Sequence, residues 1–399
     1  MIFSSTFKNA WVLSISSALA GSAGTMMMLL GGLIGTDMAP SKIWATAPNA
    51  LMIIGSAASV IPVNLGMRKL GRKHALWLFM ALGMLTCWLA TVALGANSFL
   101  LFCAASLLFG TLTTALMQSR FAAMESVASD ARASAASLVM GGGIIAAFMG
   151  PEMAVLGANL TAVTYQGSFW LSLAIIGLAA ALLALYTPVQ SLHSENQGVS
   201  TKTRELLRSR SFCTAVIGGI VAYAAMSFIM TGTPISMHHI HGHSLIDTKW
   251  VIQSHIAAMF LPSFIAPLLF KRLGIRGMML MGLGCFVATI VGGSLDTSVP
   301  GFWLQLVLLG VGWNLLFIAS TTLLPLTHMP KDNLKAQAVN DFGVFAGAAI
   351  SAFAAGWAIN LLSWQQITLL CSAPVALMLA VLLWERMAPN PTAGAQGPE

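Results

Sequence analysis

The sequence predicts an all-α membrane protein with twelve transmembrane helices arranged as two six-helix repeats. Only 8% of the 399 residues are charged and 57% are hydrophobic, whereas about 25% of a water-soluble domain is charged. A surface with so few charges fits lipid rather than water. Twelve stretches of about 20 mostly apolar residues, the length that crosses a bilayer, follow one another. Because backbone groups in hydrocarbon pair within their own segment, these stretches fold as helices.

Short polar breaks separate the predicted spans. The first span is too long for a cleaved signal peptide, and only Lys8 precedes it as a charged flank. The spans are expected at residues 11–36, 46–66, 74–95, 98–121, 133–156, 167–187, 211–232, 249–270, 276–295, 300–325, 337–361 and 364–386.

The charges between the spans predict the orientation. Lys and Arg fall almost entirely on one side of the span map, and only Lys42 and Lys249 lie opposite. By the positive-inside rule both termini and the loop 187–210 are cytoplasmic. The net charge of +7 is thus explained by membrane topology, and no nucleic-acid partner is expected. The five Cys form no cluster that would indicate a disulfide framework.

A long polar loop divides the chain in two. We expect an N-terminal six-helix bundle at 1–190, a cytoplasmic linker at 191–210, a C-terminal bundle at 211–388 and a cytoplasmic tail at 389–399. The turns Leu70–Lys73 and Leu273–Arg276 look alike and are 203 residues apart, and the same shift places Arg132 onto Lys335. A chance match of short basic turns is the alternative to a duplicated six-helix unit.

The segment Asn64–Lys73 resembles the loop motif Gly-x-x-x-Asp-Arg-x-Gly-Arg-Arg/Lys of the major facilitator family. Asn64 stands at the first Gly and Arg68 at the Asp, so the motif here lacks the carboxylate of the family's ion pair while the turn and its positive charge survive. Gly150-Pro151 resembles the family's Gly-Pro element. The resemblance implies two parallel halves with a substrate site between them at mid-membrane, and it makes Arg68 and Arg72 gating candidates.

Charged residues inside spans are costly and are therefore functional candidates. Arg120, Glu152 and Asp341 are candidates for gating or coupling, and Glu125 lies at the inner end of the same span as Arg120. Proton coupling and uniport are both compatible with this set. No Arg is placed at mid-depth, which disfavours an organic-anion substrate.

Soft ligands are abundant, since the chain contains 24 Met. Met226 and Met230 are four residues apart in span seven, and His255 and Met259 are four apart in span eight, so each pair shares a helix face. Treating the two spans as antiparallel neighbours brings the four side chains to one depth. Thioether and imidazole groups suit Cu(I). Gap-filling in helix cores is the alternative role for such methionines.

Around these residues, the runs Met226–Pro234, Gly242–Ser244 and Val251–Phe264 resemble the CcoA-type copper importers of bacteria. In that branch Met-x-x-x-Met and His-x-x-x-Met are regarded as copper-binding motifs, and both are intact. The resemblance implies copper, as transported substrate, moving from periplasm to cytoplasm through a monomer in the inner membrane by alternating access. It further implies supply to cbb3-type cytochrome oxidase assembly, and a cytoplasmic copper chaperone is a candidate partner. No resident cofactor is expected.

Secondary metal candidates surround this set. Four imidazoles and one thioether lie between spans seven and eight, where they would capture copper or merely solvate a hairpin; they belong to Met237, His238, His239, His241 and His243. The 203-residue shift puts Met27 opposite Met230 and Met52 opposite His255, so both are candidates for the same site. The alternative is that Met26, Met27 and Met28 are lipid-facing or packing residues. Cys213 would receive the ion at the cytoplasmic end, although buried Cys more often acts as a small apolar residue.

Two other functions fit the same sequence. One is a carrier of a small organic solute, with riboflavin suggested for sister sequences of the same branch; the other is a copper-binding assembly factor that does not transport. An enzyme is not expected, since a haem-copper oxidase core needs several intramembrane His and His255 is the only His well inside a predicted span. A nucleotide-binding loop is missing, so the chain is not expected to drive pumping with ATP by itself.

Overall fold

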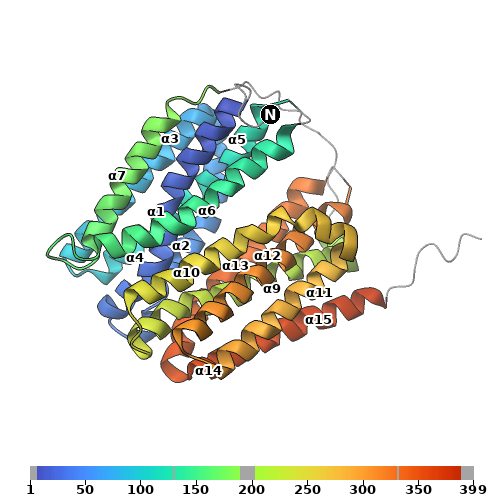
Figure 1. Cartoon of the computed structure of the whole chain (residues 1–399). Helices are drawn as coiled ribbons and strands as arrows, with labels where there is room; N and C mark the ends of the chain where they lie inside the picture. Colours follow the sequence, from blue (N-terminus) through green and yellow to red (C-terminus); the bar gives the residue numbers. More distant parts are fainter. Residues whose placement is uncertain (1–6, 129–130, 189–202, 330–331, 388–399) are drawn as a thin grey trace, which may run out of the picture.

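The computed structural model in Figure 1 describes residues 7–128, 131–188, 203–329 and 332–387. The regular structure in these residues is helical without strands, which confirms the predicted all-α class. Within these ranges, ten helices are long and apolar enough to cross a membrane. Residues 191–202 of the predicted linker and the whole predicted tail lie outside the described residues.

The first group of helices is built around α1 (Lys8–Met38), which packs along α6 and α7, while α4 packs on α2 and α3. A short 3₁₀ turn, η2 (Lys42–Trp44), links α1 to α2. The other helices of this group are α2 (Ala47–Ala58), α3 (Val60–Gly95), α4 (Phe99–Met117), α5 (Ser119–Glu125), α6 (Arg132–Gly157) and α7 (Gln166–Leu183).

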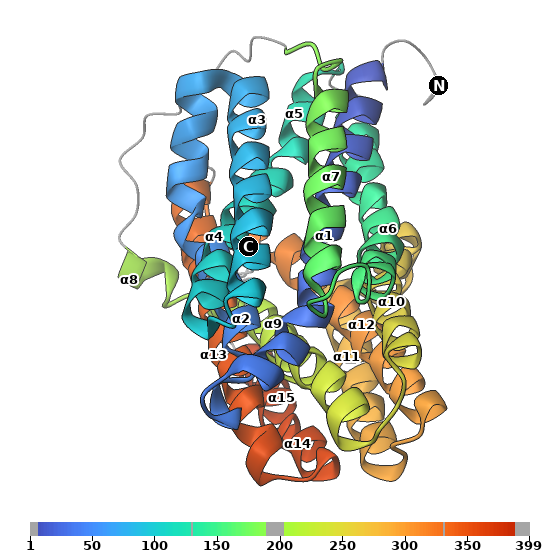
Figure 2. The same cartoon turned by 90° about the vertical axis from the view of Figure 1, so that its left-hand side faces the viewer.

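The second group is built around α9 (Arg210–Ile235), which packs on α12, α13 and α15 (Figure 2). Its remaining elements are α8 (Thr203–Leu206), η4 (Ser236–Ile240), α10 (Leu245–Phe260), η5 (Leu261–Phe264), α11 (Ala266–Leu295), α12 (Val299–Leu323), η6 (Leu324–Leu326), α13 (Asn333–Leu361), α14 (Trp364–Leu370) and α15 (Ser372–Arg386).

Serine caps start several of these helices. The Ser98, Ser209 and Ser244 side chains each accept a hydrogen bond from the backbone N–H three residues later, at the starts of α4, α9 and α10. This bond satisfies one of the four N–H groups that a helix start leaves unpaired. Ser363 and Gln366 form a reciprocal capping box at α14. The polar breaks between predicted spans therefore supply helix starts as well as loops.

The predicted repeat is visible in the backbone at two glycines. Gly71 interrupts α3 with φ 76° and ψ 161°, and Gly274 interrupts α11 with φ 67° and ψ 177°. Both conformations are essentially restricted to glycine, and the two positions are separated by the same 203 residues as the basic turns. Span two thus runs through α2 into the start of α3, and span eight through α10 and η5 into the start of α11.

The two groups touch through α6 and α10. The Lys249 ammonium lies 2.7 Å from a carboxylate oxygen of Glu152, and the Gln253 amide donates to the carbonyl of Phe148 at 2.9 Å. The Lys249 side chain is only 9% exposed, so its positive charge is stabilised by the Glu152 carboxylate rather than by water. Lys249, one of the two cations opposite the basic side, therefore ties the groups together.

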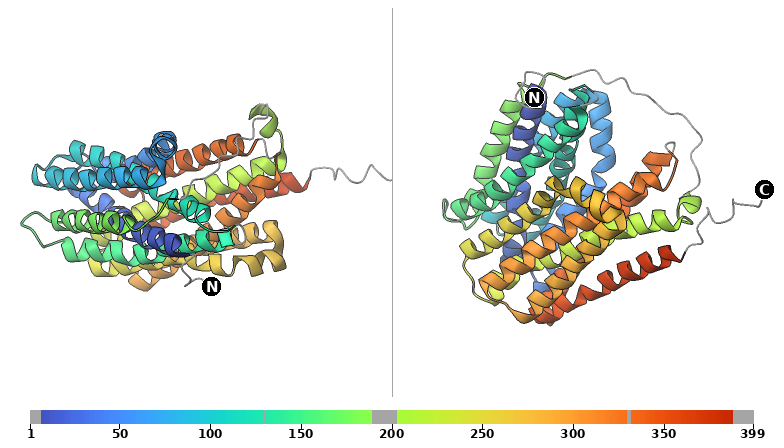
Figure 3. Two further views of the ribbon diagram at one scale, coloured as in Figure 1. Left: turned by 90° about the horizontal axis from the view of Figure 1, so that it is seen from above. Right: turned by 45° about the vertical axis from the view of Figure 1, so that its right-hand side comes forward.

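Further contacts join the groups near the same ends. The Thr46 hydroxyl donates to the carbonyl of Ala352, and the Asn360 amide donates to that of Lys42, both at 2.8 Å. At Gly32, a Cβ would lie 3.3 Å from the Ile235 side chain, so α1 and α9 approach closely. These ends are the predicted periplasmic ones, and the helix groups diverge toward the opposite ends in Figures 1 and 3.

The backbone conformation at Gly71 and Gly274 predicts that replacing either glycine will lower stability through backbone strain alone. Open space surrounds the position of a Cβ at Gly71 and Gly274, so an added methyl group meets strain in the backbone alone. Gly71→Ala and Gly274→Ala should each lower the free energy of unfolding by about 1–3 kcal/mol, measured by denaturation in detergent. Gly284→Ala in α11 is the control, since it has equally open space in helical backbone and should be neutral or slightly stabilising. Equal losses of stability from Gly71→Ala and Gly284→Ala would contradict the conclusion that the backbone conformation at Gly71 requires glycine.

The α6–α10 ion pair predicts a non-additive cycle. Glu152→Gln leaves the buried Lys249 ammonium without its partner, and this should cost more stability than the double variant Glu152→Gln/Lys249→Met. The coupling energy expected for such a pair is about 1–3 kcal/mol, measured from unfolding of the wild type, both single variants and the double variant. Additive losses would show that the two side chains do not depend on each other.

Candidate functional site

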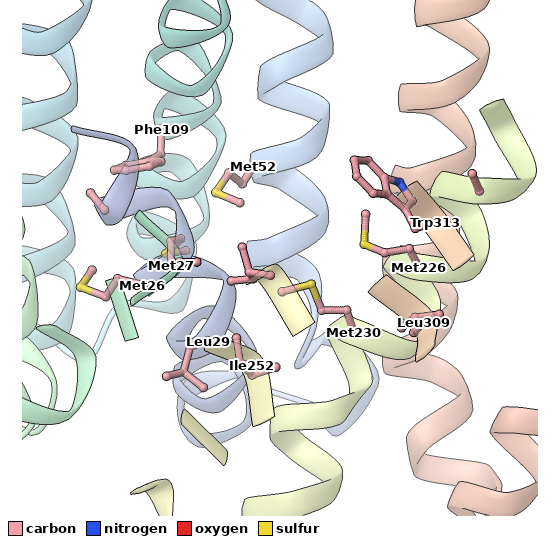
Figure 4. Packing of buried hydrophobic residues seen from close by; sticks show 14 of the residues in the cluster. Met26, Met27, Leu29, Met52, Phe109, Met226, Met230, Ile252, Leu309 and Trp313 are labelled. Carbon is pink, nitrogen blue, oxygen red and sulfur yellow. The ribbon is translucent and has the colours of Figure 1, made fainter. Parts of the chain in front are cut away.

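Met226 and Met230 line one face of α9 together with Tyr223. The spacing of three and seven residues from Tyr223 places all three side chains on the same face, and both methionines are 4% exposed. Figure 4 shows the Met226 thioether beside the indole of Trp313 from α12. This face of α9 is therefore turned to protein rather than to lipid.

His255 is fully buried between α10 and α12. Its Nδ1–H donates to the carbonyl of Leu306 at 2.7 Å, while its Nε2 is buried without a hydrogen-bond partner. The helices nearly touch here, because a Cβ at Gly310 would lie 2.7 Å from the His255 carbonyl oxygen. Met259, one turn later, is partly buried. The imidazole thus has one nitrogen in a hydrogen bond with α12 and one buried nitrogen without a partner.

The prediction that spans seven and eight are direct neighbours is wrong. α9 packs mainly on α13 and α12, whereas α10 packs mainly on α12 and α6. Met226 accordingly lies against Trp313, and His255 is bonded to Leu306 at another level of α12. Consecutive membrane helices need not pack together, because a third helix can bury both faces. The direct packing of α9 on α10 that the four-ligand prediction assumed is thus replaced by contacts of both helices with α12, and the copper-ligand set itself stays a prediction.

Of the histidines after α9, His238 and His239 lie in the π-helical turn η4, and His241 and His243 follow it. Met237 is fully buried, and His238 Nδ1 lies 2.9 Å from the carbonyl of His243. His241 Nδ1 lies 2.9 Å from the carbonyl of Ser236, His243 Nε2 lies 2.9 Å from that of Thr297, and His239 is 4.0 Å from Asp37. Each imidazole has a separate partner. Within the described ranges no three His, Cys, Asp or Glu side chains are grouped as a metal would require.

The remaining metal candidates are dispersed. Met27 lines a small cavity inside the N-terminal helices with Phe102 and Phe109, and Met52 is buried on α2. The Cys213 thiol is half-buried and donates to the carbonyl of Leu207. Met27 therefore serves the core of its own bundle, which the 203-residue shift alone could not reveal.

The degenerate loop motif is held by a different ion pair from the one its Asp normally makes. Arg68 is exposed, whereas the Arg72 guanidinium makes two bonds to the Glu125 carboxylate, at 2.6 and 3.2 Å. Arg72 also donates to the side-chain oxygen of Gln118. The turn at Gly71 is thus fastened to α4 and α5, and Arg72 rather than Arg68 makes the structural contact.

A cluster of aromatic rings, which sequence patterns did not single out, occupies the middle of α9 and α12. We call Tyr223, Trp313 and Phe317 the aromatic cluster. Trp313 and Phe317 are stacked with centroids 5.2 Å apart, and Tyr223 stands edge-on to them at 5.2 and 5.0 Å. The four-residue spacing of Trp313 and Phe317 was the available signal, but Tyr223 is 90 residues away.

Two charged candidates lie within electrostatic range of Tyr223 in the aromatic cluster. Arg120 of α5 interacts electrostatically with Tyr223 and with Asp341 of α13, across the two helix groups. The Nε of Arg120 is buried without a hydrogen-bond partner, whereas Asp341 accepts from the Asn340 amide at 3.1 Å. The structure thus brings Arg120 and Asp341 into one region, and it places Glu152 elsewhere, with Lys249.

Curated relatives share almost the whole length of the chain. The riboflavin transporter RfnT of Brucella anthropi is 34% identical over 382 residues, covering 94% of this chain and 95% of that protein. The uncharacterized transporter YdeG of Bacillus subtilis is 26% identical over 399 residues, covering 95% and 92%.

Solved structures share the fold at low sequence identity. The nucleoside transporter NupG has a TM-score of 0.75 at 13% identity, covering 94% of this chain and 99% of that one. The human organic anion transporter TETRAN has a TM-score of 0.66 at 13% identity, covering 95% and 100%. The sequence pattern of the Major Facilitator Superfamily matches residues 12–328 and, again, 215–399. The chain therefore belongs to the Major Facilitator Superfamily.

Proposed function

We propose that this transporter carries riboflavin, or a closely related flat heterocycle, across the membrane. The observation that carries the proposal is the 34% identity to a riboflavin transporter through almost the full length of both chains. The aligned region covers 94% of this chain and 95% of that protein, so it spans both halves, and the substrate site of a major facilitator transporter lies between the halves near mid-membrane.

The described side chains support an organic solute. The middle of α9 and α12 carries three aromatic rings in mutual contact, which are suited to a flat ring system. The predicted copper ligands, by contrast, are divided between the α9 and α10 faces of α12. Rocking of the two groups would open the contacts among α6, α10, α2 and α13 and expose the centre to the other side.

Copper remains a second candidate because of one atom. The Nε2 of His255 is buried without a partner, and a neutral imidazole nitrogen is a ligand for Cu(I). Met226 and Met230 are buried within the same half. If copper is the substrate, it is imported for the assembly of cbb3-type oxidase, and a cytoplasmic chaperone receives it. A related possibility is a copper-binding assembly factor that does not transport.

The membrane placement is part of the proposal. We place the chain as a monomer in a bacterial cytoplasmic membrane, and the basic residues favour an orientation with both termini inside. The contacts between the helix groups then close the periplasmic side, so the described conformation corresponds to the step that faces the cytoplasm.

Uptake measurements separate the two substrates. Cells that cannot synthesise riboflavin should grow on low external riboflavin, and accumulate it, only when they express this chain. Their copper content, measured in the same cultures, should match that of cells carrying an empty vector. Copper accumulation without riboflavin accumulation would overturn the proposal.

His255 provides the matched control for that experiment. His255→Gln keeps a polar side chain able to bond the Leu306 carbonyl but removes the imidazole ligand. Riboflavin uptake should fall less than about tenfold, the loss expected from one imperfect hydrogen bond. A selective loss of copper uptake in this variant would instead establish the metal reading.

A further inference from the structure

The aromatic cluster lies at the depth expected of a substrate. Tyr223 is 12 residues before the end of α9 at Ile235, which is about 18 Å at 1.5 Å per residue. Trp313 is 14 residues after the start of α12 at Val299, or about 21 Å along that helix. Both rings are thus near the middle of helices that cross the membrane, where the two halves of this superfamily bind their cargo.

The three rings present two kinds of surface. Trp313 and Phe317 lie nearly parallel, with 17° between their planes, and Tyr223 meets Trp313 at 72° and Phe317 at 74°. Tyr223 and Phe317 are half-buried, whereas Trp313 is 7% exposed. A flat ring can extend the stack against one face and meet the other edge-on.

One unpaired polar atom within the aromatic cluster points to a ligand. The indole Nε1–H of Trp313 is buried without an acceptor, although buried indole N–H groups usually find one. An unmade hydrogen bond in a low-dielectric interior costs free energy, so this donor is expected to bind an acceptor at some stage of transport.

Arg120 and Asp341 supply complementary charges from the two halves. Arg120 adds a second buried donor atom without a partner, its Nε. Asp341 supplies an acceptor and uses one carboxylate oxygen for Asn340. A ligand that presents carbonyl acceptors to Trp313 and Arg120 and an imide N–H to Asp341 would satisfy all three.

We propose that Tyr223, Trp313 and Phe317, together with Arg120 and Asp341, form the subsite that binds a flat heteroaromatic ring bearing carbonyls and an imide N–H. This inference rests on the proposed function, since the isoalloxazine ring of riboflavin has that chemistry. Because Arg120 comes from α5 and the aromatic cluster from α9 and α12, a ligand held by both links the two halves.

Binding to purified full-length protein tests the subsite. Riboflavin fluorescence is titrated against the wild type, Trp313→Phe and Trp313→Ala. Trp313→Phe keeps a ring but removes the N–H donor, and should weaken binding about tenfold; Trp313→Ala also removes the stack, and should weaken it about 100-fold. Trp357→Phe is the control, because Trp357 is 51% exposed on α13 and should leave the affinity unchanged.

A competitor shows which part of the solute is recognised. Lumichrome, which keeps the flat ring system without the ribityl chain, should displace riboflavin from the wild type, and D-ribitol should not. Arg120→Gln should weaken lumichrome and riboflavin by the same factor. Size-exclusion profiles and melting temperatures matching the wild type identify variants that fold.

The outcomes distinguish this inference from the proposed function. A wild type that neither binds nor transports riboflavin overturns the proposed function, and the subsite with it. A wild type that binds riboflavin while Trp313→Phe and Arg120→Gln bind it equally well overturns the subsite alone.

Discussion

Hydrocarbon offers no hydrogen-bond partner, and this constraint governs the rest of the structure. Backbone groups must pair within helices, and side-chain polar groups must find partners from neighbouring helices or remain a cost. Thr46, Asn360 and Lys249 meet the requirement across the two helix groups. The same bonds that satisfy these groups also hold one end of the bundle closed. Transport therefore requires these hydrogen bonds and this ion pair to break together, and their number sets part of the free-energy barrier to the conformational change.

The fold could be predicted because its causes are local. Span length, basic loops and the 203-residue repeat depend on short segments, and Gly71 and Gly274 adopt the same backbone conformation because the same turn is required twice. The breaks within spans two and eight, at Ser59 and at η5, were not predicted, since hydrophobic length cannot distinguish one long helix from two short ones. The residue boundaries of the two bundles stay predictions.

The site was harder to predict because it depends on which helices touch. His255 and Met226 lie 29 residues apart in sequence, yet α12 contacts both of their helices. Tyr223 and Trp313 lie 90 residues apart and are in ring contact. Helical spacing predicts which face of a single helix a residue occupies, but the partner of that face is a tertiary property. The sequence therefore predicted correctly that these side chains are buried, but it paired α9 with α10, whereas both helices pack on α12.

The methionines illustrate why burial alone does not identify a metal site. Met26 accepts a hydrogen bond from Ser172 through its sulfur, Met27 fills space beside Phe102, and Met226 lies against Trp313. An unbranched thioether adapts to irregular gaps and packs well on aromatic rings, and a bundle that changes shape during transport needs side chains that can repack. Sulfur on the face of α9 is thus compatible with a flat aromatic solute, because polarizable side chains contact such rings favourably without fixing their orientation. Orientation then depends on the few directional donors, of which Trp313 Nε1 and Arg120 Nε are unpaired in the part of the chain described.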